Sequence, residues 1–162
     1  MESVRAAVGP DLPRCVELLT EASREAGGVR GGALLAALGG FGGAGAAAGP
    51  GAPVDLARVV GDWYGAGSLR VGTIDDVVVG LAAGTVAVGE RTVGRVECCY
   101  VEPAARGVGV GLGLVSALLA WFGERECSDV DAFALPGDRS MKQLLETAGF
   151  KTRLLVLHRS PS

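Results

Sequence analysis

The chain has 162 residues, of which 49% are hydrophobic and 20% charged, and its formal net charge is −3. This composition is that of a folded globular protein, so intrinsic disorder is excluded despite the 27 glycines. The length suits one domain with a single core, which we expect to span residues 1–162. A slightly acidic balance lacks the clustered basic surface of nucleic-acid-binding proteins, so no nucleic-acid partner is expected.

The first ten residues, MESVRAAVGP, contain no apolar run of the kind found in secretory signals, which predicts a cytoplasmic protein. The four cysteines form no C-x-x-C pair, so we expect reduced thiols and no metal site. The uncharged stretch 31–54 is mostly Gly and Ala and is interrupted by Pro50 and Pro53, which argues against a membrane span.

Both strands and helices are expected in the first half of the chain. Weak alternation over 2–8 predicts a strand, and Asp11 can cap a helix whose apolar residues recur at helical spacing up to Ala22. The glycine- and alanine-rich segment 27–53 is expected to be a flexible loop or insertion, because glycine makes any fixed conformation entropically costly. Helical spacing resumes over 55–65.

The second half predicts an antiparallel meander followed by helices and short strands. Three β-rich runs joined by short polar turns cover 68–74, 77–88 and 91–101. The segment 112–126 is apolar nearly all round and predicts a buried central helix. Beyond it we expect a strand over 129–135, a helix capped by Asp138 and closed by Gly149, and a terminal strand over 150–159.

The most informative segment is VECCYVEPAARGVGVGLGLVSALL, residues 96–119. It predicts a strand that ends at Pro103, a basic residue, alternating glycines and then a helix. Small residues between a strand and a helix let backbone amides converge, and the helix N-terminus adds partial positive charge. The segment therefore predicts an anion cradle suited to a pyrophosphate. Neither G-x-G-x-x-G nor G-x-x-x-x-G-K is present there, so a dinucleotide fold and a nucleoside triphosphatase are not supported.

The spacing R-x-x-G-x-G, formed by Arg106, Gly109 and Gly111, follows V-x-P at Val101 and Pro103. It resembles the acetyl-CoA signature of the GNAT N-acetyltransferase superfamily, and a Gly149-Phe150 pair follows a later helix, as in that family. The expected order of elements matches the family over nearly the whole chain. The resemblance implies an α/β (α+β) fold with a mixed, mainly antiparallel sheet flanked by helices, and acetyl-CoA bound where central strands splay.

The resemblance also implies which residues bind the cofactor. Main-chain groups of Cys99, Tyr100 and Val101 would lie along the pantetheine arm, and the Val101 amide would meet the acetyl carbonyl. Arg106 and the amides of the following loop would hold the pyrophosphate; these amides belong to Gly107, Val108, Gly109, Val110, Gly111 and Leu112. Physically, a donor at the carbonyl stabilises the oxyanion that develops when an amine attacks the thioester.

A protonated amine must lose a proton before it attacks, so such an enzyme needs a general base or a water path to one. Strand alternation places Glu97 on one face with Cys99 and Val101, beside the reacting end of the cofactor, and many relatives carry a glutamate near this position. A structural ion pair of Glu97 with Arg95 or Arg70 is the equal alternative. Glu97 is nevertheless the catalytic residue that we expect.

The sequence departs from the family at two positions. Many relatives use a tyrosine five residues before the phenylalanine of the G-F pair to protonate the leaving thiolate, and Leu145 stands there. Asp138 occupies the place of an asparagine that contacts the cofactor, where an aspartate is more simply a helix cap. Tyr100 and Tyr64 are weak substitutes for the acid. Trp63, Tyr64 and the loop after Gly27 are expected to border the acceptor pocket.

Other reactive side chains have ordinary explanations. Cys98 and Cys99 suggest a covalent acetyl-cysteine, but neither has an evident histidine partner, and His158, the only histidine, is near the chain end. We therefore expect direct acetyl transfer from acetyl-CoA to a primary amine, on a small molecule or a protein lysine or N-terminus. The alternative is a catalytically silent acyl-CoA-binding module. The resemblance further implies a possible homodimer.

Overall fold

The computed structural model describes residues 1–30, 32, 54–159 and 161. Most of the segment 27–53, which the sequence predicts to be a loop or insertion, lies outside the described residues. The helices and strands are β1 (Glu2–Ala6), α1 (Leu12–Gly27), α4 (Leu56–Gly65), β2 (Arg70–Ile74), β3 (Val77–Ala87), β4 (Val93–Val101), α5 (Val110–Glu124), β5 (Asp129–Asp131) and α6 (Arg139–Thr147).

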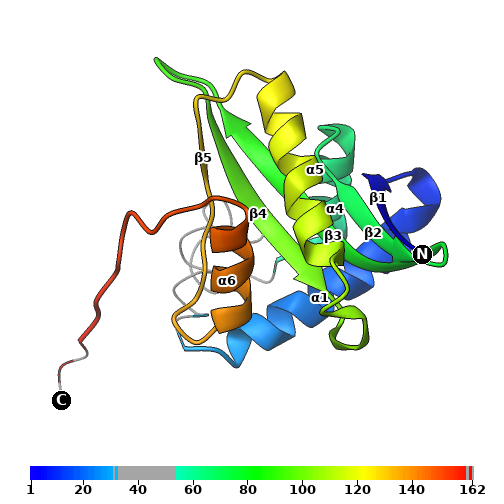
Figure 1. Ribbon diagram of the computed structural model, residues 1–162, viewed down its shortest axis with the longest axis horizontal. Coiled ribbons are helices and arrows are strands. Elements are labelled where there is room, and N and C mark those ends of the chain that lie inside the picture. Colours follow the sequence, from blue (N-terminus) through cyan, green and yellow to red (C-terminus); the bar gives the residue numbers. More distant parts are fainter. Residues whose placement is uncertain (31, 33–53, 160, 162) are drawn as a thin grey trace.

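One five-stranded sheet, in the order β1-β2-β3-β4-β5, forms the middle layer (Figure 1). All neighbouring strands are antiparallel except β4 and β5, which are parallel. Helices α1 and α4 pack on one face of the sheet, and α5 crosses the opposite face with α6 beside it. The mixed, mainly antiparallel sheet flanked by helices is confirmed.

Glycines of β2, β3 and β4 lie directly beneath helix α5 and leave no room for side chains there. A Cβ atom on Gly72 would lie 2.4 Å from Val110 Cγ1, and one on Gly84 would lie 2.4 Å from Phe122 Cζ. A Cβ atom on Gly94 would lie 2.5 Å from Phe122 Cδ1. Phe122 is 1% exposed, so its ring fills the space that these missing side chains leave.

Several local predictions are confirmed with their physical cause. The helix predicted over 55–65 is present as α4, and at its start the Asp55 carboxylate accepts a hydrogen bond from Arg58 N, 3.2 Å away. Asp75 and Asp76 connect β2 to β3 with φ angles of 47° and 64°, the left-handed pair that a two-residue hairpin requires. Gly149 ends the last helix with φ 94°.

Asp11 does not cap α1 through its side chain, contrary to the sequence-based expectation. Its carboxylate instead accepts hydrogen bonds from Arg5 at 2.6 Å and from the Val8 amide at 2.8 Å. The Arg5 guanidinium therefore holds the pKa of Asp11 below its ordinary value. The Asp11 side chain therefore connects the start of α1 to β1 instead of capping the helix.

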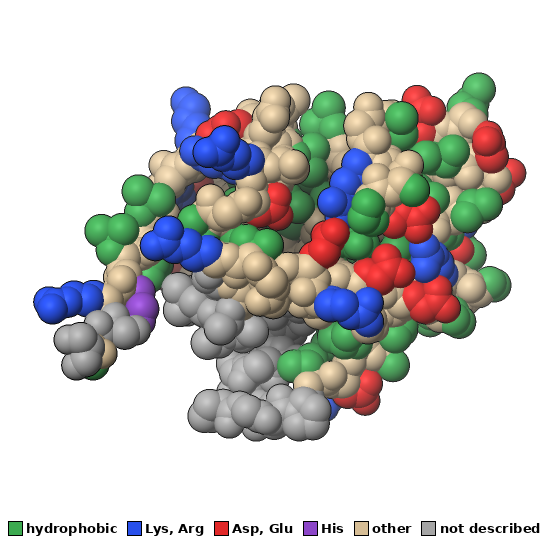
Figure 2. All heavy atoms as spheres, turned by 90° about the horizontal axis from the view of Figure 1, so that it is seen from below, with side chains coloured by type: hydrophobic (Ala, Val, Ile, Leu, Met, Phe, Trp, Pro, Cys, Tyr) green, Lys and Arg blue, Asp and Glu red, His purple; other side chains and the backbone are tan. Residues whose placement is uncertain are grey.

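The terminal strand predicted over 150–159 is wrong, because no residue in that range is in a strand. The segment leaves the body of the molecule, carrying hydrophobic, basic and histidine side chains (Figures 1 and 2). Leu154 and Leu155 are 76% and 77% exposed, so the apolar run has no sheet to pack on. The predicted strand over 129–135 is also shorter, since pairing with β4 stops at Asp131. Among the described residues, no helix combines the length and apolar character that crossing a membrane requires.

We predict that Gly94→Ala lowers the free energy of unfolding by about 1–3 kcal/mol, because the new methyl group overlaps the buried Phe122 ring. Chemical denaturation measures this change. Gly123→Ala is the matched control, since its Cβ atom meets nothing within 4 Å and alanine favours the helix by up to about 1 kcal/mol. Equal stability of Gly94→Ala and the wild type would contradict the close packing of α5.

Candidate active site

The loop between β4 and α5 presents the start of a helix without a side-chain cap. Gly107 and Gly109 have φ angles of 86° and 96°, which a residue with a side chain rarely adopts. Gly109 is the N-cap of α5, and no side-chain hydrogen bond caps the helix in the described structure. The first amides of a helix have no intrahelical partner, so those that follow Gly109 are available to an anion.

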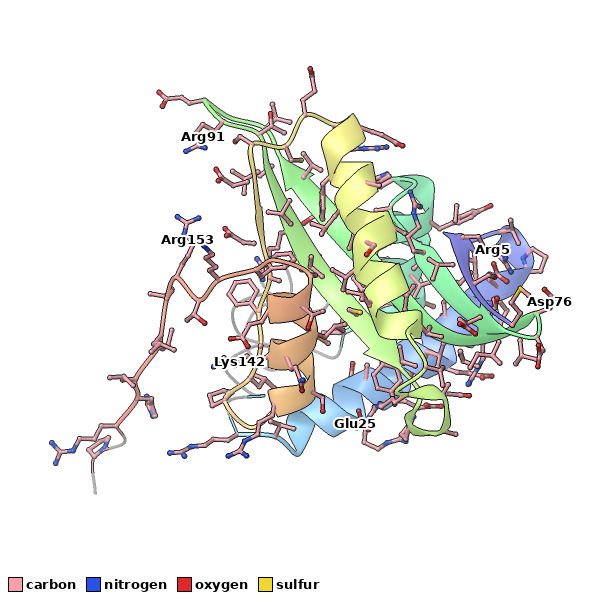
Figure 3. All side chains as sticks on the ribbon, in the orientation of Figure 1. Arg5, Glu25, Asp76, Arg91, Lys142 and Arg153 are labelled. Carbon is pink, nitrogen blue, oxygen red and sulfur yellow. The ribbon has the colours of Figure 1, made fainter. Side chains whose placement is uncertain are left out.

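Arg106 fixes this loop from both sides. Its Nε donates to the Val101 carbonyl at 2.8 Å, and its Nη2 donates to both carboxylate oxygens of Glu25, at 2.7 and 3.0 Å. Glu25 lies at the C-terminal end of α1, beneath the N-terminus of α5 (Figure 3). The guanidinium carbon is also 5.4 Å from the centre of the Tyr100 ring. The described contacts of Arg106 thus join α1, β4 and the loop.

Strands β4 and β5 stop pairing before β4 reaches this loop. They pair only from Val93 opposite Asp129 to Arg95 opposite Asp131, whereas β3 remains paired with β4 up to Val101. Among the described residues, the β4 edge from 96 to 101 therefore has no strand on the β5 side. The edge includes Cys99, Tyr100 and Val101, whose main chain the sequence assigns to the pantetheine arm.

Helix α6 stands beside the first turn of α5. A Cβ atom on Gly111 would lie 3.3 Å from Leu144 Cδ2, and the Cys99 thiol is 4.0 Å from the Gly111 carbonyl oxygen that accepts its weak hydrogen bond. Asp138 caps α6 by accepting from Met141 N at 2.9 Å, as its sequence position predicts. Leu145, at the position where relatives have tyrosine, is 6% exposed and packs as a core residue.

A β-bulge decides which way the Glu97 side chain points. Gly84 pairs with Val96 and Ala83 pairs with Cys98, so Glu97 is the extra residue. Beyond the bulge, Cys99 and Val101 pack with α5, whereas Cys98 and Tyr100 pack with α1 and α4. The sequence prediction that Glu97 shares a face with Cys99 and Val101, with Tyr100 opposite, is therefore wrong.

Glu97 contacts Thr85 and Arg95 on the face covered by α1 and α4. Thr85 Oγ1 donates to Glu97 Oε1 at 2.6 Å, and Arg95 Nε is 3.6 Å from the same oxygen. The Glu97 side chain is only 4% exposed, and Oε2 has no hydrogen-bond partner among the described residues. The Arg95 guanidinium lies 4.6 Å from the centre of the Phe133 ring. The ion pair with Arg95 and a free carboxylate oxygen therefore exist together.

A pocket of about 410 Å³ lies between α4, β3 and the C-terminal end of α5. Trp63, Thr85 and Trp121 are among its lining residues. Tyr64, the second aromatic residue expected near an acceptor pocket, is 41% exposed and is not part of the lining within the described structure. The pocket and the Glu97 carboxylate therefore share one residue, Thr85.

Sequence reasoning missed Thr85, Glu25 and Phe133. Glu25 meets Arg106 across 81 positions of the chain, and Thr85 meets Glu97 across 12. Thr85 is the partner of Arg95 in the register of β3 and β4. A hairpin prediction could have found this pair only if the bulge had been known. No local motif marks Glu25 or Phe133.

Burial makes the two adjacent thiols poor nucleophiles. It raises the pKa of Cys99 to about 12, and it raises the pKa of Cys98 even further, with a smaller effect from the neighbouring Cys99 and Glu97. A thiol reacts through its thiolate, so both groups stay protonated and inert at neutral pH. This supports direct transfer over a covalent acetyl-cysteine.

We predict that iodoacetamide at pH 8 labels Cys98 and Cys99 about a thousandfold more slowly than a free thiol, because so little thiolate is present. Peptide mass spectrometry of timed samples measures the rate. Protein unfolded in urea serves as the control and should be labelled at both positions. Rapid labelling of the folded chain would show that either thiol is activated.

Comparison with solved structures shows the same fold. The chain is 16% identical to AAC(6')-Iy bound to the bisubstrate analogue CoA-S-monomethyl-acetylneamine, with TM-score 0.67 and coverage of 100% of this chain and 99% of that one. It is 17% identical to a predicted acetyltransferase from Clostridium acetobutylicum with acetyl-CoA, with TM-score 0.67 and coverage of 99% and 96%. An aminoglycoside acetyltransferase from an uncultured soil metagenomic sample, in complex with sisomicin, is 13% identical, with TM-score 0.63 and coverage of 99% and 95%.

The sequence comparisons place this fold in a family. No curated protein matches the chain. A family model described as "Acetyltransferase (GNAT) family" matches residues 51–150, which include α4, the four strands β2 to β5, α5 and α6. The resemblance carried by the R-x-x-G-x-G segment is therefore confirmed, and the chain belongs to the GNAT acetyltransferase family.

Proposed function

We propose that this protein transfers an acetyl group from acetyl-CoA to a primary amine by direct attack in a ternary complex. The observation that carries the proposal is the position of Glu97. Its buried carboxylate lies in the stretch of β4 that β5 leaves unpaired, and this stretch leads into the uncapped start of α5. A proton acceptor, an open strand edge and an anion cradle thus lie along one strand and the loop after it.

Acetyl-CoA fits these features of the chain. The uncapped amides after Gly109 suit a pyrophosphate, and the free backbone groups of an open strand edge can bind the amides of the pantetheine arm. Similar structures contain CoA, acetyl-CoA or a CoA-derived bisubstrate analogue. The Arg106 side chain bonds Glu25 and Val101, so its contribution to the cradle is to hold the loop in place.

In the proposed reaction the Val101 amide would donate to the acetyl oxygen. That donor contributes most when negative charge develops on the oxygen in the transition state. Glu97 would take the amine proton, directly or through water. With Leu145 in place of a tyrosine, the CoA thiolate would leave without a side-chain acid at that position and take its proton from water.

The acceptor is proposed to be a primary amine on a small molecule or on a protein lysine or N-terminus. Three of the similar structures are described as aminoglycoside acetyltransferases, and one of these contains sisomicin. A panel of sisomicin, spermidine and a lysine-containing peptide, with thiol release from acetyl-CoA as the readout, tests the acceptor class. Saturable acetyl-CoA binding without thiol release would favour the alternative, a silent binding module, for which the replacement of tyrosine by Leu145 is the argument.

We predict that Val108→Glu weakens acetyl-CoA binding about tenfold, because it adds a negative charge between Gly107 and Gly109 where the pyrophosphate would bind. Val108 is half exposed and its backbone is not left-handed, so the change strains nothing. Isothermal titration calorimetry measures the dissociation constant. Val88→Glu, at an exposed valine that follows β3, is the matched control and should bind like the wild type. Equal weakening of both variants would show that the cofactor does not bind at this loop.

We predict that Glu97→Gln lowers kcat about a hundredfold or more while acetyl-CoA still binds, because glutamine has the same shape but cannot take a proton. Thiol release measures kcat, and calorimetry measures acetyl-CoA binding. Glu90→Gln, at an exposed position between β3 and β4, is the control. An unchanged kcat would show that Glu97 is not the base.

A further inference from the structure

Oε1 and Oε2 of Glu97 have different surroundings. Oε1 accepts the hydrogen bond from Thr85 Oγ1 at 2.6 Å and is also the oxygen nearest Arg95 Nε, at 3.6 Å. Oε2 is buried and has no hydrogen-bond partner in the part of the chain that the structure describes. An unpartnered buried carboxylate oxygen is costly, so its presence calls for an explanation.

We infer that Thr85 is a positioning residue that holds Oε1 so that Oε2 accepts the proton of the acceptor amine. This inference rests on the proposed function and adds the atom that acts and the residue that orients it. As the amine nitrogen forms its bond to the acetyl carbon, its proton passes to Oε2. The carbon–sulfur bond then breaks, and the CoA thiolate leaves with the electron pair.

The strand geometry explains why Thr85 can play this part. Thr85 is paired with Arg95 across β3 and β4, and Glu97 is the bulged residue that follows on the same face. Gly84 and Gly94 next to this pair face the Phe122 ring, so Thr85 and Arg95 point to the opposite face. Arg95 is itself held over the Phe133 ring. Thr85 on β3 and Arg95 on β4 therefore both restrict the rotation of the Glu97 carboxylate.

The described contacts place two charged or titratable groups beside Glu97, and both are on β4. Arg95 forms the ion pair, and the Cys98 thiol stays protonated because burial raises its pKa. Asp62 of α4 and Arg125 of α5 line the pocket that also includes Thr85. Thr85 is uncharged, so changing it alters the hydrogen bond to Glu97 without altering a charge.

The test compares Thr85→Val, which removes the hydroxyl and keeps the shape, with Thr85→Ser, which keeps the hydroxyl. We expect Thr85→Val to lower kcat about tenfold or more with an unchanged KM for acetyl-CoA, and Thr85→Ser to restore kcat. Thr73→Val is the matched control. It also removes a threonine hydroxyl that forms a hydrogen bond between strands, in this case with Ser3 Oγ, 2.8 Å away.

The acceptor in this test is the member of the panel of sisomicin, spermidine and lysine peptide that gives the fastest thiol release. Thr85→Ala provides a second variant without a hydroxyl if Thr85→Val does not fold, and thermal unfolding checks each protein. Wild-type kinetics in the variants without a hydroxyl, or the same loss in Thr85→Ser, would overturn the role of Thr85 while Glu97→Gln still impairs turnover. Full turnover by Glu97→Gln, or no thiol release from any amine, would overturn the proposed function itself.

Discussion

The close approach of α5 to the sheet is the constraint on which the rest of this structure depends. The helix can lie on β2, β3 and β4 only because glycines occupy the contact positions, and Phe122 and Val110 fill the space above them. This contact fixes the direction of α5 and therefore the position of its N-terminus. The uncapped first turn comes to lie beside the end of β4, which is the arrangement that the proposed cofactor site requires.

The loop that joins β4 to α5 is held by the strand before it and by a helix distant in the sequence. Arg106 bonds the Val101 carbonyl and the Glu25 carboxylate, so one side chain connects the sheet, the loop and the helix on the other face of the sheet. A guanidinium with several fixed donors is suited to this task. The backbone amides after Gly109 are then oriented by the protein before any ligand arrives, which reduces the ordering that binding costs.

The site brings together two kinds of polar group with different requirements. The loop offers amides toward solvent, whereas Glu97 is nearly fully buried and is oriented by Thr85 and Arg95. A single extra residue in β4 separates these environments, because the bulge sends Cys99 and Val101 toward α5 and leaves Glu97 on the other face. The same residue lies where β5 has diverged, so the bulge and the open strand edge occur together.

The sequence by itself determined the features that depend on neighbouring residues. The Asp138 cap, the Asp75-Asp76 turn, the meander and the R-x-x-G-x-G segment before a helix all follow from local propensity and spacing. Only the tertiary structure decided the bulge at Glu97, the contacts of Arg106 and Thr85, and the absence of a strand over 150–159. These depend on strand register and on packing between residues far apart in the chain. Side-chain alternation cannot reveal an extra residue, and an apolar run forms a strand only where another strand is placed to receive it.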